Sequence, residues 1–456
     1  MAGRDPPSGI QSGLENMKKI LALLFAVAIS GFAQDFRQMG SNYYAYPTPT
    51  AKYTKAPAGY KPFYLSHYGR HGSRFHQPAD HYHFLYSTLA KADSAGKLTD
   101  LGKSLLERTK FLDEYAAPRA GDLTQLGVAQ HQGIAKRMVK NFPEIFKNDA
   151  YIEAYASTSV RCVVSMAAFL EELRAQKPKL NIHQESGKYL MSFINPLDFG
   201  KIISESNTPA WQKENEKMYS HVNPARMMHA IFNDSNYIKN NVNAGDLYGK
   251  IYEIGNSLQG SPEIKFSFDD LWTEDELFSR WRAQNAWWYS VLGNNPFGKK
   301  EGLENARPLL KNVLEMADKV IDADTAKAKT GKQPAATLRF GHDTMVFPFA
   351  VLLQMENGTR NTGIEIAEME GLHKVWRDYE ISPMAANVQL VFYKSSKKGA
   401  PILVKVMLNE TEQKLPVTCE TKGPSASSGT LQSCPAAPYY RWDDFREFYG
   451  KIANKN

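Results

Sequence analysis

The chain has few cysteines, and it lacks long apolar segments, internal repeats and blocks of like charge. Only three of its 456 residues are cysteines. Past residue 33, no segment approaches the ~20 apolar residues that a membrane-spanning helix needs. Lysine and arginine (55) barely outnumber aspartate and glutamate (48), and the basic residues are scattered. We therefore expect no stable membrane insertion and no nucleic-acid partner, because nucleic-acid-binding domains concentrate positive charge on one surface.

The one pronounced apolar run lies near the N-terminus. It spans residues 20–32, follows Lys18-Lys19 and ends in Gly31-Phe32-Ala33. Positive residues, a short apolar run and a small-residue exit are typical of a bacterial secretory signal peptide. The sequence predicts that residues 17–33 are cleaved and that the mature protein is periplasmic or secreted. Residues 1–16 precede this otherwise complete signal, and residues 1–33 are excluded from the expected fold.

The cysteines fit an exported protein. Export permits disulfide bonds, and Cys419 and Cys434 bracket a Gly/Ser-rich loop at residues 423–433. We predict a bridge between them. Cys162 lies in an apolar, helix-like run, where we interpret it as a buried, inert thiol rather than a nucleophile.

Strand and helix signals alternate in the first and last thirds of the chain. Apolar strands are expected at residues 63–68, 151–156 and 335–340, whereas residues 175–300 are helix-like. The expected fold is α/β: a mixed, mostly parallel central sheet flanked by helices, with a mostly helical insertion domain. The expected parts are a leader and signal (1–33), the first part of the core (34–174), the insertion (175–300) and the second part of the core (301–456).

A polar cluster follows each of the three expected strands. Arg70-His71-Gly72-Ser73-Arg74 comes after the first, Ser157-Thr158 with Arg161 after the second, and Gly341-His342-Asp343 after the third. Ligands of open α/β sheets bind at the carboxyl ends of strands. We therefore expect the clusters to form one site.

These residue types suit phosphoryl transfer. Arginine provides planar, charged forks that match phosphate oxygens, and a histidine between them can attack phosphorus if one ring nitrogen is unprotonated and the other is held. Gly72 is expected to let a phosphate approach the backbone. Asp343 is placed to give a proton to the departing alkoxide and then to activate water.

The first cluster resembles the Arg-His-Gly-x-Arg signature of the histidine acid phosphatases, and His342-Asp343 resembles their distal His-Asp pair. Residues 157–165, 338–342 and 404–410 are similar to the multiple inositol polyphosphate phosphatase and phytase branch. That branch typically has His-Ala-Glu where this chain has His342-Asp343-Thr344. The resemblance implies that no cofactor or metal is needed. It implies a nucleophile at His71, phosphate ligands at Arg70, Arg74, Arg161 and His342, and a proton donor at Asp343.

Structural roles compete with these assignments. Arg70 and Arg74 would otherwise be surface charges, Arg161 a solvated side chain at a helix start, and Asp343 a helix cap. Four histidines, His67, His76, His81 and His83, lack the spacing of a zinc signature. We expect them to be core or rim residues, with His76 as a possible substrate contact. Trp281, Trp287 and Trp288 are expected to pack in a core.

The leading hypothesis is an exported phosphomonoesterase acting on a small phosphate ester, with inositol polyphosphates such as phytate as the expected substrates. One alternative is a broad-specificity phosphatase for sugar phosphates or nucleotides, and another is a non-catalytic phosphate-ester binding protein. A phytase pocket should carry extra cations for the remaining phosphates of its substrate.

Overall fold

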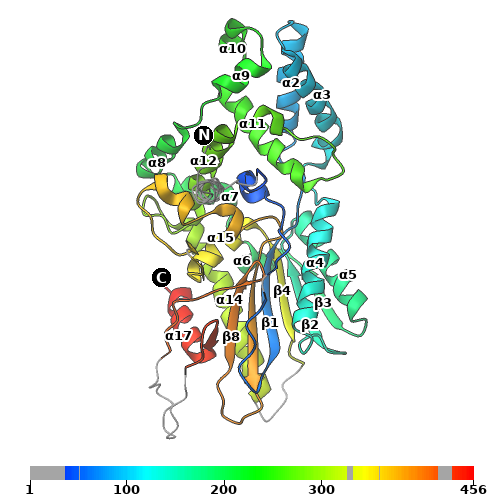
Figure 1. Cartoon of the computed structure of the whole chain (residues 1–456). Helices are drawn as coiled ribbons and strands as arrows, with labels where there is room; N and C mark the ends of the chain where they lie inside the picture. Colours follow the sequence, from blue (N-terminus) through cyan, green and yellow to red (C-terminus); the bar gives the residue numbers. More distant parts are fainter. Residues whose placement is uncertain (1–35, 51, 326–331, 359, 420–433, 456) are drawn as a thin grey trace, which may run out of the picture.

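A mixed sheet forms the centre of the computed structural model, which describes residues 36–50, 52–325, 332–358, 360–419 and 434–455 (Figure 1). The predicted signal peptide and the loop at 423–433 lie outside these residues. Among the helices of the described ranges, none is long and apolar enough to cross a membrane.

The central sheet has eight strands in the order β10-β8-β7-β1-β4-β2-β3, with β9 paired to β8. β1 pairs parallel with β4, β4 with β2, and β2 with β3, whereas β7 lies antiparallel to both β1 and β8. The expected α/β fold with a mixed, mostly parallel sheet is confirmed. The strands are β1 (Tyr60–Arg70), β2 (Tyr151–Ala156), β3 (Asn181–Ser186), β4 (Ala336–Gly341), β7 (Asn387–Ser395), β8 (Leu403–Leu408), β9 (Thr411–Glu412) and β10 (Tyr439–Arg441). A separate small hairpin joins β5 (Glu356–Asn357) and β6 (Arg360–Asn361).

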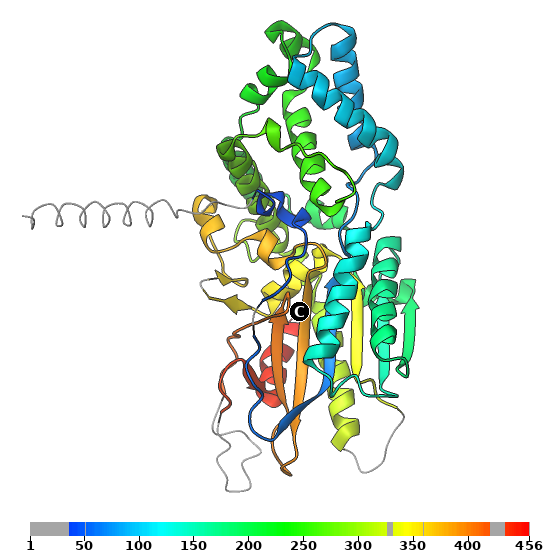
Figure 2. The same cartoon turned by 45° about the vertical axis from the view of Figure 1, so that its right-hand side comes forward.

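Helices cover both faces of the sheet (Figures 1 and 2). Side chains of a strand alternate between faces, and β1 shows this, because Tyr64 and Tyr68 enter one apolar core while Leu65 enters the other. The Leu65 face is covered by α4 (Gln125–Asn141) and α5 (Val160–Gln176). The opposite face is covered by α14 (Arg307–Thr325), α15 (Asp343–Leu352) and α17 (Trp442–Ala453).

A third apolar core holds helices above the end of the sheet where β1 and β4 terminate (Figure 1). Its main members are α2 (Asp80–Ser94), α3 (Asp100–Tyr115), α9 (Ala225–Ile231) and α11 (Ala244–Ser257). These helices come from both the expected first core part and the expected insertion, and β3, inside the range 175–300, joins the sheet. The division into domains stays a prediction.

Shorter elements and two longer helices connect these layers. They are η1 (Gln38–Tyr43), η2 (Ala117–Arg119), η3 (Lys188–Leu190), α6 (Met191–Ile194), α7 (Phe199–Ser206), α8 (Pro209–Tyr219), α10 (Ser235–Asn241), η4 (Leu258–Gly260), η5 (Asp269–Leu271), α12 (Glu274–Leu292), α13 (Glu301–Glu304), η6 (Met369–Lys374) and α16 (Asp378–Ile381).

The cysteines lie as expected. A disulfide joins Cys419 and Cys434. Cys162 is a free, fully buried thiol on α5, and burial raises its pKa to about 12, so it carries no thiolate at neutral pH.

Candidate active site

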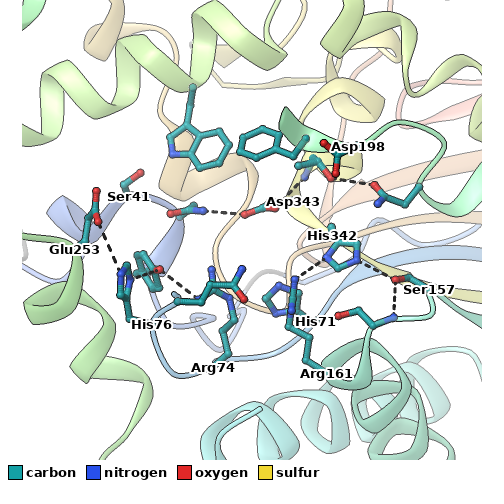
Figure 3. A pocket seen from close by; sticks show the side chains of 18 of the residues that line it. Ser41, His71, Arg74, His76, Ser157, Arg161, Asp198, Glu253, His342 and Asp343 are labelled. Atoms are coloured by element: carbon teal, nitrogen blue, oxygen red, sulfur yellow. Dashed lines mark hydrogen bonds and ion pairs between the residues drawn. The ribbon is translucent and has the colours of Figure 1, made fainter. Parts of the chain in front are cut away.

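The three polar clusters meet at one pocket of about 740 Å³ between the carboxyl ends of the strands and the helices above them (Figure 3). β1 and β4 are adjacent and parallel, with Arg70 in register with Gly341, so the segments that follow them emerge side by side. β2 lies on the other side of β4 and brings the start of α5 to the same place. The predicted residues that line the pocket are His71, Arg74, His76, Arg161, His342 and Asp343.

The loop after β1 is held rigidly by its backbone. The Gly72 amide donates to Ser165 Oγ at 3.2 Å, and the Ser73 amide donates to Gln130 Oε1 at 2.8 Å. A Cβ atom on Gly72 would lie 2.5 Å from the carbonyl oxygen of Gly127 on α4. Gly72 therefore lets α4 pack against the loop, and the expectation that it also makes room for a phosphate stays a prediction.

His71 is buried and oriented by its own loop. Its Nδ1 lies 2.9 Å from the Gly72 carbonyl oxygen, which can only accept, so Nδ1 carries the proton and Nε2 is left with a free lone pair. Burial, followed by the charges of Arg70, Arg161 and Arg74, holds the pKa of His71 well below its usual value. The imidazole is therefore neutral at mildly acidic pH.

His342 lies beside His71, with its ring edge-on at a centroid distance of 5.7 Å. Its Nε2 lies 2.9 Å from Ser157 Oγ, and its Nδ1 lies 3.5 Å from Arg161 Nη2. Arginine can only donate, so Nδ1 accepts and Nε2 donates to the serine. Burial and the charge of Arg161 lower the pKa of His342 to about 4.

Asp343 forms an ion pair with the fully buried Arg70, Oδ2 to Nη2 2.8 Å, and accepts from Asn42 Nδ2 at 2.8 Å. Burial would raise the pKa of this carboxyl group, but Arg70 and the Asn42 hydrogen bond bring the pKa below its usual value. Asp343 is the first residue of α15, one position past the cap residue His342, and its Oδ1 accepts a hydrogen bond from the neighbouring Thr344 amide at 3.0 Å. Asp343 is therefore not the N-cap of α15.

Each of the three arginines has a buried side-chain nitrogen without a hydrogen-bond partner among the described residues. The Nε atoms of Arg70, Arg74 and Arg161 are all buried and have no hydrogen-bond partner within the described part of the chain. Arg70 does not itself line the pocket, because it lies behind Asp343 and donates through Nη1 to the carbonyls of Asn42 (2.6 Å) and Ser382 (2.8 Å). Buried, unpaired charged donors are costly unless an anion completes them.

The four histidines separate in the structure. His67 is buried in the core against Phe169 and Phe340, and His83 is 57% exposed at the surface. His76 and His81 line the pocket, stack on each other and lie beside Glu253 of α11. Burial lowers the pKa of His76 to about 3.

Several pocket residues carry no signal in the sequence. Asn42 and Tyr43 reach the pocket from η1, whose Ser41 adopts a left-handed backbone (φ 57°) and hydrogen-bonds to Asp378. Asp198 and Phe199 come from the start of α7, and Trp288 from α12. Trp281 is fully buried, as expected, and Trp287 is partly buried against the core, whereas Trp288 belongs to the core and also forms a wall of the pocket.

The family follows from a comparison with family models. Residues 69–409 match the model of the histidine phosphatase superfamily (branch 2), and the chain belongs to that family. A search of curated proteins finds no significant match.

Solved structures show the same fold. The Bifidobacterium longum multiple inositol polyphosphate phosphatase in complex with inositol hexasulfate superposes with a TM-score of 0.71 at 18% identity, covering 89% of this chain and 96% of that one. The phosphate complex of the same protein gives 0.71 at 17% identity, covering 91% and 98%. The phytase from D. castellii gives 0.61 at 12% identity, covering 92% and 86%. The chain is thus a phosphatase of this superfamily, and an enzyme rather than a binding protein.

Proposed function

We propose that this chain is an exported phosphomonoesterase that transfers a phosphoryl group to His71 and then to water, with inositol polyphosphates such as phytate as its leading substrate class. The observation that carries the mechanism is the His71 ring, whose Nδ1 is held by the Gly72 carbonyl while Nε2 remains free among three arginines. Export rests on the signal-peptide pattern at residues 17–33.

In the first step the lone pair of His71 Nε2 attacks phosphorus, and the bond from phosphorus to the ester oxygen breaks. The forks of Arg74 and Arg161, which line the pocket, stabilise the charge on the transferring phosphoryl oxygens. Arg70, whose two Nη atoms already bind Asn42, Ser382 and Asp343, contributes its positive charge and its unpartnered Nε. His342 stays a proposed phosphate ligand. When Arg161 turns from Nδ1 to the phosphate, the other tautomer can donate from Nδ1 to a phosphoryl oxygen while Nε2 accepts from Ser157 Oγ.

Asp343 gives the leaving alkoxide its proton and later takes one from the attacking water. The ion pair with Arg70 keeps this carboxylate ionised in the free enzyme. The proton must therefore arrive with the substrate. A phosphate monoester has its second pKa near ~6, so in mild acid it binds as the monoanion, and its proton can pass to Asp343.

The charge of the pocket supports a second candidate substrate class. Arg74 and Arg161 are the only lysine or arginine residues among those described as lining it, and Asp198 and Glu253 place carboxylates on the far walls. Tyr43, Phe199 and Trp288 add aromatic surface. This lining favours esters with a single phosphate, such as sugar phosphates or nucleotides, since extra cations for further phosphates are missing.

The test is release of inorganic phosphate by the purified protein in EDTA between pH 4 and 7, from phytate, glucose 1-phosphate and p-nitrophenyl phosphate. We expect metal-independent turnover that His71→Ala abolishes and that His183→Ala, a change at an exposed histidine on β3, leaves intact. Full activity in His71→Ala would refute the mechanism. The ratio of kcat/KM on phytate to that on glucose 1-phosphate decides between the substrate classes.

Export has its own measurement. N-terminal sequencing of protein recovered from the periplasm or medium should begin directly after Ala33. Protein found only in the cytoplasm with an intact N-terminus would contradict export and leave the phosphatase mechanism untouched.

A further inference from the structure

Three metal-ligating side chains, those of His76, His81 and Glu253, converge on one wall of the pocket. His76 and Glu253 lie across the pocket from His342 (Figure 3), and Tyr43 separates His76 from Arg74. His76 and His81 come from the loop after β1 and the start of α2, and Glu253 comes from α11. His76 Nε2 lies 2.6 Å from His81 Nδ1 and 3.8 Å from Glu253 Oε2, and His81 Nδ1 lies 3.3 Å from the same oxygen.

These separations suit a tetrahedral metal site. Nitrogen and oxygen ligands lie ~2.0–2.2 Å from zinc, which puts neighbouring ligand atoms in a tetrahedral site about 3.3–3.6 Å apart. The three measured separations bracket that value. For all three atoms to contact one ion, the two imidazoles would need to move apart by less than about 1 Å, and His76 and Glu253 would need to come closer by about 0.2–0.5 Å.

Proton counting also favours a cation here. His76 Nε2 and His81 Nδ1 are too close for both to carry a proton. At most one proton is therefore available to three atoms that can each accept a hydrogen bond: these two nitrogens and Glu253 Oε2. In one tautomer that proton lies on His81 and is shared between His76 and Glu253. In the other it lies on His76, and the bare nitrogen of His81 faces the carboxylate. A divalent cation in the proton's place would satisfy all three atoms.

The surroundings fit a metal site with an open position. Tyr43 Oη lies 2.7 Å from His76 Nδ1, the kind of outer contact that orients a ligating histidine. His76 is 97% buried, since its exposed fraction is 3%, whereas all three residues border the pocket and leave one side open to it. Lys250 Nζ, 3.4 Å from Glu253 Oε2, already pairs with the carboxylate and would compete with a cation.

We propose that His76, His81 and Glu253 form a binding site for a divalent transition-metal cation, zinc above all, on the wall of the pocket. Imidazole and carboxylate ligands suit zinc. The bound ion would replace the negative charge of Glu253 on this wall of the pocket by a positive one. The phosphoryl transfer itself does not pass through it.

The test is zinc binding by the mature, EDTA-stripped protein in metal-free buffer without phosphate or substrate, measured by isothermal titration calorimetry. We expect one Zn²⁺ per chain. Glu253→Gln and His81→Gln should each weaken binding by ~10-fold or more, and Tyr43→Phe by about 10-fold through the lost outer contact. Lys250→Gln should tighten binding, because it removes the competing cation. His183→Gln, at an exposed histidine on β3, is the matched control and should leave the affinity unchanged.

Absence of binding, or binding that Glu253→Gln and His81→Gln leave unchanged, would overturn the proposal. Far-UV circular dichroism of each variant identifies any loss caused by misfolding, and the visible spectrum of the Co²⁺ form checks for four-coordinate geometry independently of affinity. Because no substrate is present, failure of this site and failure of the phosphatase mechanism give different results.

Discussion

At the scale of single residues, the positive charges of the site add to burial in keeping its histidines neutral. Arg161 is a major electrostatic cause of the lowered pKa of both His71 and His342, after burial itself. Arg161→Gln should raise both pKa values toward ~6.5, so a larger fraction of His71 is protonated and inert in mild acid. The acid limb of kcat/KM should move to higher pH, and kcat should fall by ~10²–10³.

Arg161→Lys is the matched comparison, because lysine keeps the charge but loses the fork. We expect it to lower kcat while leaving the acid limb near its original pH. An Arg161→Gln enzyme with an unshifted pH profile would show that Arg161 does not set the protonation of His71.

Asp343 can be tested through the leaving group. Asp343→Asn keeps the shape of the side chain and the contact to Asn42 but removes the transferable proton. We expect kcat to fall by ~10²–10⁴ on an alkyl phosphate. The fall should be much smaller on p-nitrophenyl phosphate, since nitrophenolate leaves without protonation. Asp198→Asn is the control, because Asp198 borders the pocket and caps α7, a role that asparagine also fills. Equal losses on both substrates would contradict the assignment.

At the scale of elements, the site is built by the close approach of α4 to the loop after β1. In Gly72→Ala the new methyl group would lie 2.5 Å from the Gly127 carbonyl oxygen and 2.6 Å from its Cα, both backbone atoms. Helix and loop must separate, which we expect to cost about 1–3 kcal/mol of unfolding free energy and to lower kcat by displacing His71. Denaturant unfolding and kinetics measure the two effects.

Gly249→Ala on α11 is its control. A Cβ atom there would meet nothing within 4 Å, so the gain in helix propensity should leave stability equal or higher by up to about 1 kcal/mol. Stability of Gly72→Ala equal to that of the parent would refute the packing account.

The elements that the sequence predicts are those with local patterns. β2 has the expected bounds, and α4 begins after Thr124, whose side chain accepts from the Gly127 amide as a cap. β3 was not foreseen because it is a largely exposed edge strand without apolar alternation. The contact of Asn42 with Asp343 spans 301 positions of sequence, and no local pattern encodes it. Motifs at strand ends thus predicted the part of the pocket that His71, Arg161, His342 and Asp343 line, whereas its other walls depend on the tertiary fold.

At the scale of the whole molecule, buried neutral histidines set a limit on stability in acid. Burial lowers the pKa of His67 and of His131 to about 3, against ~6.5 in the unfolded chain. Between these values the unfolded chain binds more protons, so the stability present above pH ~6.5 is lost as pH falls. Each of these histidines should cost about 2 kcal/mol between pH 7 and pH 5.

Asp378 acts in the opposite direction. Burial raises its pKa to about 6, so the folded chain gains a proton before the unfolded chain does, which offsets about 1 kcal/mol over the same interval. The loss of stability from the buried histidines is larger than this gain, and His76 and His342, with pKa values lowered to about 3 and about 4, add to the loss.

We predict that the guanidinium concentration at the unfolding midpoint is lower at pH 5 than at pH 7. His131→Leu should reduce the difference in unfolding free energy between the two pH values by about 2 kcal/mol, because it removes one buried titrating ring packed against Phe340. An unchanged difference would mean that His131 does not titrate on unfolding. Since His71, the proposed nucleophile, also requires a depressed pKa, the burial that keeps it neutral in mild acid is part of the same burial that makes the fold less stable there.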